Sequence, residues 1–250
     1  LFYYCTNHTG MGGQANTPVT NSFSNFAGTI QSNISPNTTS GFSVVSYTGT
    51  GANATVGHGL GVAPKMFIVK ERSNANSWEV YHASQGAGKN AQLNTTAAFE
   101  SAGSSRWNST APTSSVFSIG TDSGVNRSSS NYIAYCFADV QGYSNGNANG
   151  TFIYTGFAPA FVIVKAISIS GENWQLNDNK RKTFNVNSTS LFPNTNGAES
   201  TDGMYIDMLS NGFKARETGN GTNGSGVSYI YMAFAENPFT SSAGTPVTAR

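Results

Sequence analysis

Apolar and polar residues alternate over several short stretches of the chain. In SWEVYHAS, every second residue from Trp78 to His82 falls on one face of an extended segment. NWQLND alternates in the same way from Trp174. The apolar, β-branched runs MFIVK and FVIVK predict two further strands, each preceded by an Ala-Pro pair. Lys70 and Lys165 close these two runs, and we expect their charged ends to reach water.

Two longer segments, YIAYCFAD (132–139) and YIYMAFAE (229–236), have large residues on one face and mostly small residues on the other. This pattern predicts a central strand that is buried on both sides. Gly- and Asn-rich turns separate the predicted strands, and no segment sustains apolar residues at helical spacing over three turns. The sequence therefore predicts an all-β protein built from sandwiches, which we expect to be jelly-roll-like.

The strand pattern occurs twice. GVAPKMFIVK (61–70) returns as GFAPAFVIVK (156–165) with six identical residues. Four markers keep their order at offsets of 95 to 97 residues, namely Pro64, Trp78, Phe117 and Tyr132, which recur as Pro159, Trp174, Phe213 and Tyr229. Collinear markers at a domain-sized spacing indicate an internal duplication.

The duplication divides the chain into five parts. We expect two tandem homologous β-sandwich domains over residues 41–140 and 150–238, joined by a linker at 141–149. Residues 1–40 are polar and low in complexity, which predicts an extended N-terminal connector or the end of an upstream module. Residues 239–250 form a C-terminal tail.

Composition narrows the possible partners. Only 10% of the residues are charged and the net charge is +1, so the clustered basic residues that bind nucleic acid are missing. No apolar run is long enough to predict a membrane span. Cys5 and Cys136 do not make a disulfide framework, and their redox state stays open.

Candidate binding residues are few. Trp107 lies in the polar stretch SSRWNST between Arg106 and Asn108, without a counterpart in the second copy. An exposed indole flanked by hydrogen-bond donors suits a sugar, whereas packing of the indole against its own sandwich is the structural alternative. His58 lies between two glycines and suits either a ligand contact or a plain turn.

Catalytic and cofactor motifs are missing from the sequence. It contains no nucleophile elbow, no P-loop and no histidine pair at metal-binding spacing, so we expect no catalytic residue, cofactor or metal and do not predict an enzyme. The segment TDSGVNRSSSN around Asp122 has the oxygen-rich look of a calcium loop, but its spacing favours an Asx-type turn. Asp139 and Glu236 occupy equivalent strand ends, which indicates a structural role.

Several long blocks resemble a family. The segments GFSVVSYTGTGANATVGHGLGVAPKMFIVKERS, YIAYCFADVQGYS, FIYTGFAPAFVIVK and YIYMAFAENPF, in this order, resemble a duplicated domain of bacteriophage tail-fibre and other virion structural proteins, which are common in marine phages. The resemblance covers residues 41–250 and implies a structural protein located in the virion. It brings no catalytic motif with it.

Three functions follow as hypotheses. The first is a tail fibre or similar appendage that binds other virion proteins and forms homo-oligomers, for which the trimer is the common arrangement in such fibres. Charged residues usually protect exposed sheet edges, and this chain has few of them, so neighbouring subunits would cover its edges. The second is a carbohydrate-binding, lectin-like module that recognises host surface glycans through loops rich in Asn, Ser, Gly and Tyr. The third, a polysaccharide-degrading enzyme, lacks a catalytic constellation.

Overall fold

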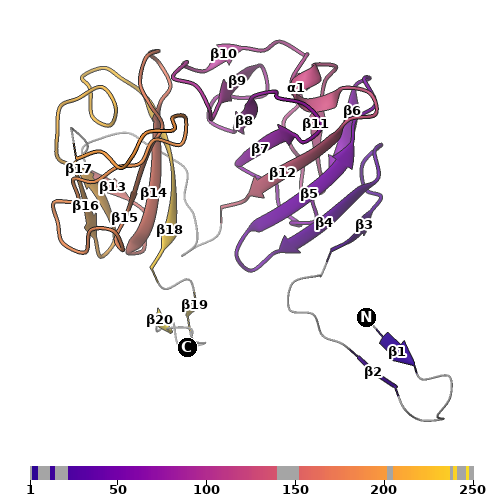
Figure 1. Cartoon of the computed structure of the whole chain (residues 1–250), viewed down its shortest axis with the longest axis horizontal. Helices are drawn as coiled ribbons and strands as arrows, with labels where there is room; N and C mark the ends of the chain where they lie inside the picture. Colours follow the sequence, from indigo (N-terminus) through magenta and orange to yellow (C-terminus); the bar gives the residue numbers. More distant parts are fainter. Residues whose placement is uncertain are drawn as a thin grey trace.

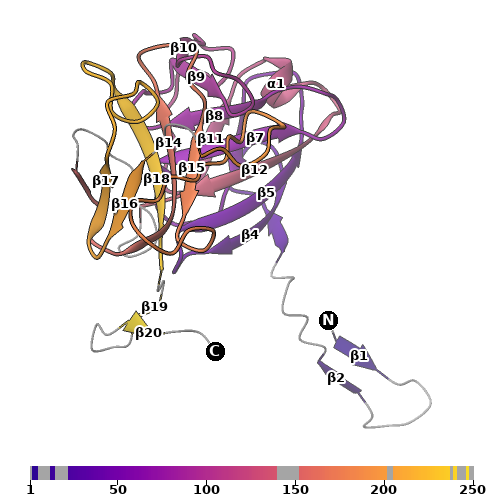
Figure 2. The ribbon, with the colours of Figure 1, turned by 60° about the vertical axis from the view of Figure 1, so that its left-hand side comes forward.

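The chain folds almost entirely into antiparallel β-strands. A computed structural model describes residues 2–4, 12–14, 22–139, 152–201, 205–236, 239–240 and 246–247. Within these residues the one α-helix is α1 (Ser123–Asn126). Figures 1 and 2 show two β bodies packed side by side, one from each copy. The predicted all-β class with two tandem sandwich domains is confirmed, whereas the predicted linker at 141–149 lies outside the described residues.

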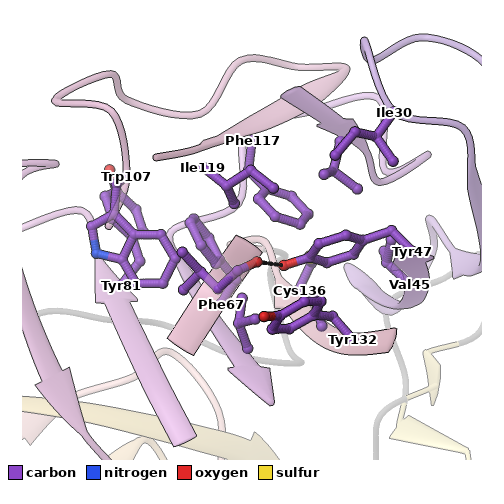
Figure 3. Packing of buried hydrophobic residues seen from close by; sticks show 14 of the residues in the cluster. Ile30, Val45, Tyr47, Phe67, Tyr81, Trp107, Phe117, Ile119, Tyr132 and Cys136 are labelled. Atoms are coloured by element: carbon purple, nitrogen blue, oxygen red, sulfur yellow. Dashed lines mark hydrogen bonds between the residues drawn. The ribbon is translucent and has the colours of Figure 1, made fainter. Parts of the chain in front are cut away.

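The first body consists of two layers of unequal size. The larger layer is an eight-stranded sheet in the order β10 (Glu100–Ser101), β9 (Lys89–Gln92), β8 (Trp78–His82), β7 (Met66–Glu71), β12 (Asn131–Phe137), β5 (Phe42–Thr48), β4 (Ser32–Asn37) and β3 (Phe23–Asn25). The smaller layer consists of β6 (Ala54–Gly57) and β11 (Val116–Ile119). Aromatic and branched side chains fill the space between the layers (Figure 3).

The first domain begins earlier than residue 41. Strand β4 pairs with β5 from Ser32 to Asn37, and β3 adds one more strand at the edge. Ile34, on β4, is buried in the core, and Ile30 forms a bridge to Val56 on β6. The expectation that residues 1–40 form a connector is therefore wrong for the segment from 23 to 37. The two isoleucines anchor this otherwise polar segment together with Ser32, whose buried hydroxyl donates to Gly57 O at 2.9 Å.

The second body consists of two three-stranded sheets. One has the order β15 (Gln175–Asp178), β14 (Pro159–Ala166) and β18 (Tyr229–Ala235), and the other β13 (Phe152–Tyr154), β17 (Gly212–Ala215) and β16 (Ile206–Leu209). Val162, Val164 and Phe213 are among the residues that fill the space between them. Two short hairpins lie near the chain ends, β1 (Phe2–Tyr4) with β2 (Gly12–Gln14) and β19 (Phe239–Thr240) with β20 (Pro246–Val247).

The strand pairing confirms that the two bodies are copies of one unit. Strand β7 lies between β8 and β12, and β14 lies between β15 and β18. The register matches as well, since Val69 pairs with Glu79 in the first copy and Val164 with Gln175 in the second. The MFIVK and FVIVK runs therefore occupy equivalent places.

An equivalent tyrosine anchors a loop in each copy. The Tyr132 hydroxyl donates to Ser123 O at 2.6 Å and accepts from Arg127 N at 2.7 Å. The Tyr229 hydroxyl donates to Asn220 O at 2.8 Å and accepts from Gly224 N at 2.7 Å. The partners lie nine and five residues before the tyrosine in both cases, so the duplication preserved a specific loop clamp as well as the strands.

The copies pack against each other through their sheets. The outer faces of β7, β8 and β12 meet the outer faces of β14, β15 and β18 in one shared apolar cluster. Ile68 and Ile163 lie in this cluster, and the rings of Phe137 and Phe234 approach within 6.2 Å across it. The molecule is thus a stack of four β layers with three apolar cores. Strands β12 and β18 are central in their sheets, as predicted. One face of β12 is fully buried, and its other face, with Phe137, is partly buried on the side of the other copy.

Hydrogen bonds reinforce the contact between the copies. The buried indole of Trp174 donates its Nε1–H to Gln92 O at 3.1 Å. The Lys165 ammonium is also fully buried and donates to Thr96 O at 3.1 Å and to Glu172 O at 2.7 Å. The expectation that Lys165 reaches water is therefore wrong. Its charged end satisfies carbonyl groups of both copies, and burial lowers its pKa to about 8.

Candidate functional site

The four residues singled out in the sequence do not converge on one site. Trp107 is completely buried and packs edge-on against Phe67 and Tyr81, with ring centroids 4.9 and 6.2 Å away (Figure 3). Its Nε1–H donates to Lys89 O at 3.1 Å. The expectation of an exposed, sugar-stacking indole is wrong, because the ring completes the first core and finds a carbonyl partner there.

His58 is buried as well. Its Nδ1 accepts from Leu60 N at 3.2 Å, so its Nε2 carries the proton and donates to Thr113 O at 3.1 Å. Burial lowers the pKa of this imidazole and keeps it neutral. The adjoining Gly59 has a φ of +71°, which glycine adopts without strain. Of the two alternatives for His58, the structural turn is the one that its contacts support.

Asn108 takes part in the loop through its backbone. Its φ is +49°, its N–H donates to Ser104 O, and its carbonyl accepts from the hydroxyl of Thr110. Asparagine tolerates this left-handed conformation better than most residues. Asn108 therefore shapes the turn that carries Trp107 into the core.

Arg106 is the one member of the four that lines a hollow. The hollow has a volume of about 160 Å³ and lies at the edge of the eight-stranded sheet, among residues of β9, β10 and the loops around them. The Arg106 guanidinium binds two carboxylates, Glu79 through Nε at 3.2 Å and Asp122 through Nη1. Asp122 caps α1 by accepting from Gly124 N at 2.6 Å, which confirms the predicted Asx-type turn.

A buried polar network forms the floor of this hollow. Glu79, on β8, is almost fully buried and accepts hydrogen bonds from Asn90 Nδ2 at 2.5 Å and Gln92 Nε2 at 3.3 Å. Asn90 lies on β9 and is only 7% exposed. Its Oδ1 has no hydrogen-bond partner within the described part of the chain. An unpaired buried acceptor is costly to the fold, and Gln175 Oε1 and Asn179 Oδ1 of the second copy are unpaired in the same way.

The second copy shows that the fold does not need this charged network. Gln175 occupies the position of Glu79, as the strand register demonstrates. The same holds for another buried carboxylate of the first copy, Glu71, which accepts a hydrogen bond from Asn74 and pairs with Arg127, and whose position the second copy fills with Ala166. The buried carboxylates Glu71 and Glu79 are therefore specific to the first copy.

The second copy has a larger groove of its own, at a different place. It has a volume of about 560 Å³ and lies between the loop around Phe184 and the ends of β14 and β16. Phe184 is 80% exposed at its rim, and Lys180 approaches Glu236 to 3.5 Å. This groove was not predicted, because neither Phe184 nor the Lys180–Lys182 run carries a recognisable motif.

Metal centres and membrane helices are absent from the part of the chain that the structure describes. The described ranges contain no group of three or more His, Cys, Asp or Glu side chains placed to hold a metal ion. They also contain no helix with the length and apolar character of a membrane span. Cys136 is a free, buried thiol, and Cys5 lies outside the described residues.

The fold defines a class, a duplicated antiparallel β protein, and the described residues of its first copy form a polar depression. Residues 15–238 match a family described as a domain of unknown function, DUF7483, and the chain belongs to this family. The match runs through both copies, so the family unit is the pair and not the single sandwich. No curated protein and no solved structure matches the chain.

Proposed function

We propose that this chain is a structural protein of a phage virion, a tail fibre or similar appendage that contacts the host surface. The observation that carries the proposal is the apolar cluster shared by the two copies, which joins them into one body. An appendage must hold its shape outside the cell, and a contact of this kind prevents the domains from moving independently. The resemblance of residues 41–250 to virion proteins supports the same function.

The proposal includes assembly with copies of itself, as a trimer, and with other virion proteins. The outer face of the β13–β17–β16 sheet supports it. Phe152 and Tyr154 are 42% and 65% exposed on that face, whereas the intervening Ile153 packs into the core. Tyr205, just before β16, is 38% exposed. Aromatic residues at neighbouring positions of one sheet face are typical of a protein–protein contact.

Two measurements test the proposal. Mass spectrometry of purified particles and immunogold labelling should detect the chain on the virion; a chain found only in the unassembled fraction would refute it. Light scattering should give three times the chain mass of 26.3 kDa. A monomer at micromolar concentration would contradict the trimer while leaving the virion assignment to the first experiment.

Carbohydrate binding is the second candidate, and the polar lining of the hollow, which includes Gln92, Ser101 and Ser105, favours it. Amide and hydroxyl groups of this kind make hydrogen bonds with sugar hydroxyls. The hollow beside Arg106 is the site in question, in place of the indole that the sequence predicted. A glycan array without hits, together with no adsorption of the purified protein to host cells, would dispose of this candidate.

We propose no catalytic activity. Two carboxylates line the hollow, Asp122 and Glu100. Asp122 and the buried Glu79 both bind the Arg106 guanidinium. A glycosidase needs two carboxyl groups that flank an open position for the scissile bond. Release of reducing ends from a host polysaccharide by the purified chain would overturn this assignment.

A further inference from the structure

We propose that the second copy binds the N-terminal strand β1 of a neighbouring chain along its open side, which consists of β13 and the edge of β18 that faces away from β14. This inference rests on the proposed self-assembly and names the contact through which it occurs. Three observations carry it: this side is covered in the first copy, it is open in the second, and an apolar ribbon of the chain lies apart from both bodies.

In the first copy the chain covers this side with its residues 23–48. Strand β5 pairs with β12 along the whole of β12, and β4 and β3 continue the sheet beyond it. The segment between β3 and β4 covers β6, where Thr29 N donates to Thr55 Oγ1 at 2.9 Å. Asn25 Oδ1 lies at the place where a side chain on Gly57 would begin. Both sheets of the first copy are therefore extended or covered on this side.

The same side of the second copy is open in the part of the chain that the structure describes. Strand β13 occupies the place of β6, because each pairs with the strand that carries the repeated phenylalanine, β17 or β11. Phe152 and Tyr154 thus stand at the positions of Thr55 and Gly57. Both aromatic rings are exposed, whereas Gly57 is buried. Strand β18 occupies the place of β12 and is the last strand of its sheet.

The outer edge of β18 lacks the usual protection. Exposed strand edges are normally blunted by charged residues, by proline or by a covering segment. The sequence of β18, YIYMAFA, contains no charged residue and no proline. On the opposite side of this copy the chain covers β15 and β16 itself, through the bridges of Leu176 with Leu191 and of Ile206 with Asn187. An apolar edge of this kind is the template on which an added strand binds.

Strand β1 is suited to be that added strand. Within the described residues it pairs with β2, and the hairpin lies apart from both bodies in Figures 1 and 2. A two-stranded hairpin without a further sheet or core is marginally stable in water. The first five residues, LFYYC, are all apolar or aromatic, and aromatic residues favour strands. Pairing with β18 would give this ribbon the sheet that it lacks.

The direction of the N-terminal segment favours a neighbouring chain over the second copy of the same chain. Strand β3, which follows this segment, is the last strand of the eight-stranded sheet and lies on the side of the first body away from the second (Figure 1). Residues 5–22 connect β1 to β3 and extend by at most about 60 Å. A strand that each chain gives to the next is a heterologous contact, which closes into a ring where the rotation permits. The contact therefore agrees with the proposed trimer.

A photo-cross-linker tests which segment binds to the open side. Benzoylphenylalanine replaces the exposed Tyr154 in the full chain, in a mixture of isotopically light and heavy chains. Mass spectrometry should identify peptides that join residues 1–6 of one chain to position 154 of another. Links within one chain, to residues 1–6 or to 140–151, would overturn the inference. Links between the β13 strands of two chains, or no link at all, would overturn it as well.

Variants on both partners measure the contact. Phe152→Lys combined with Tyr154→Lys puts two charges on the open side and should weaken self-association, measured by sedimentation, by roughly tenfold or more. Phe184→Lys, a matched change of an exposed aromatic residue elsewhere in the second copy, should leave self-association unchanged.

The change on the donor strand is Tyr3→Pro. Proline lacks the N–H donor of a strand ladder, and β1 belongs to neither body, so this variant should weaken self-association similarly without a change in Tm. Self-association that persists undiminished in the double variant or in Tyr3→Pro would refute the contact. The trimer would then stand on another surface, and particle labelling tests the virion assignment separately.

Discussion

Replacement of Trp174 by alanine should weaken the contact between the copies more than any other single truncation in the second copy. The indole is 1% exposed, lies in the cluster that both copies share, and donates to Gln92 O of the first copy at 3.1 Å. One side chain therefore contributes apolar burial and a hydrogen bond to the same interface.

The magnitude follows from these contacts. A buried aromatic side chain removes roughly 150–250 Å² from water, which contributes about 4–6 kcal/mol at about 25 cal/mol per Å². Alanine keeps part of this, and truncation of a buried tryptophan costs about 3–5 kcal/mol. In a chain of this size about 1 kcal/mol lowers Tm by roughly 2–4 °C, so we expect a fall of about 10 °C for Trp174→Ala. Trp174→Phe keeps most of the ring and should cost about 1–3 kcal/mol, chiefly for the unpaired carbonyl of Gln92.

Calorimetry and hydrogen exchange separate the interface from the rest of the fold. The amide of Gly171 donates to Thr96 O across the interface at 3.0 Å, and it should exchange much faster in Trp174→Ala. Trp107→Ala is the matched control, because it also removes a buried indole and its N–H, but within the core of the first copy. A fall in Tm below about 2 °C for Trp174→Ala, or unchanged exchange at Gly171, would refute the view that this contact joins the copies.

Three further predictions concern buried groups. Tyr132→Phe and Tyr229→Phe should each lower the free energy of unfolding in urea by about 1–3 kcal/mol, since both leave a loop amide unpaired; a neutral effect at either tyrosine would contradict the shared clamp. Burial lowers the pKa of Lys165 from its ordinary 10.5 to about 8, so the unfolded chain binds more protons between these two pH values. The stability difference between the wild type and Lys165→Met should therefore shift in favour of the wild type by up to about 3 kcal/mol as the pH rises from 8 to 10.5; a difference that stays constant with pH would refute this. Burial lowers the pKa of His82 from 6.5 to about 4, so its contribution is present above pH 6.5 and is lost as the pH falls towards 4; acid unfolding of His82→Gln should therefore be less steep than that of the wild type over this range.

The strands with strict alternation could be predicted from the sequence. The residue sizes along YIAYCFAD separate Tyr132, Ala134 and Cys136, which are all buried in the first core, from the opposite face. That prediction succeeded because side chains alternate between the two faces of a strand, and here one face is buried and the other partly buried. Because the second copy repeats the pattern in YIYMAFAE, the same strand could be predicted there.

Segments with isolated apolar residues could not be predicted. Ile30 and Ile34 anchor the N-terminal strands, but two isoleucines in a stretch of Asn, Ser and Thr produce no periodic signal. Trp107 posed the opposite problem, because its polar neighbours suggested an exposed loop while the ring is buried. The polarity of a short segment describes the neighbours of a residue, whereas tertiary packing decides whether the residue itself is buried or exposed.

The hollow was only partly accessible from the sequence. Arg106 was identified beside Trp107, whereas Asn90, Glu100 and Asp122 come from β9, β10 and the cap of α1. Their proximity depends on the pairing of β8 with β9 and β9 with β10, which the sequence of these short strands does not specify. The sequence also does not show that the amide nitrogen of Asn90 donates to Glu79 while its Oδ1 stays unpaired.

The contact between the copies gives a physical explanation for the sequence similarity of their strands. Each copy turns the same sheet face towards the other, so that Ile68 meets the surface of its own counterpart, Ile163, and Phe137 meets Phe234. A surface that packs against a copy of itself is the arrangement of a two-fold dimer. Joining the two units in one chain made that contact intramolecular, which raises the effective concentration of each half for the other. The duplication then left each outer end free to diverge, and the carboxylates around Arg106 in one copy, with Gln175 in the other, are the trace of that divergence.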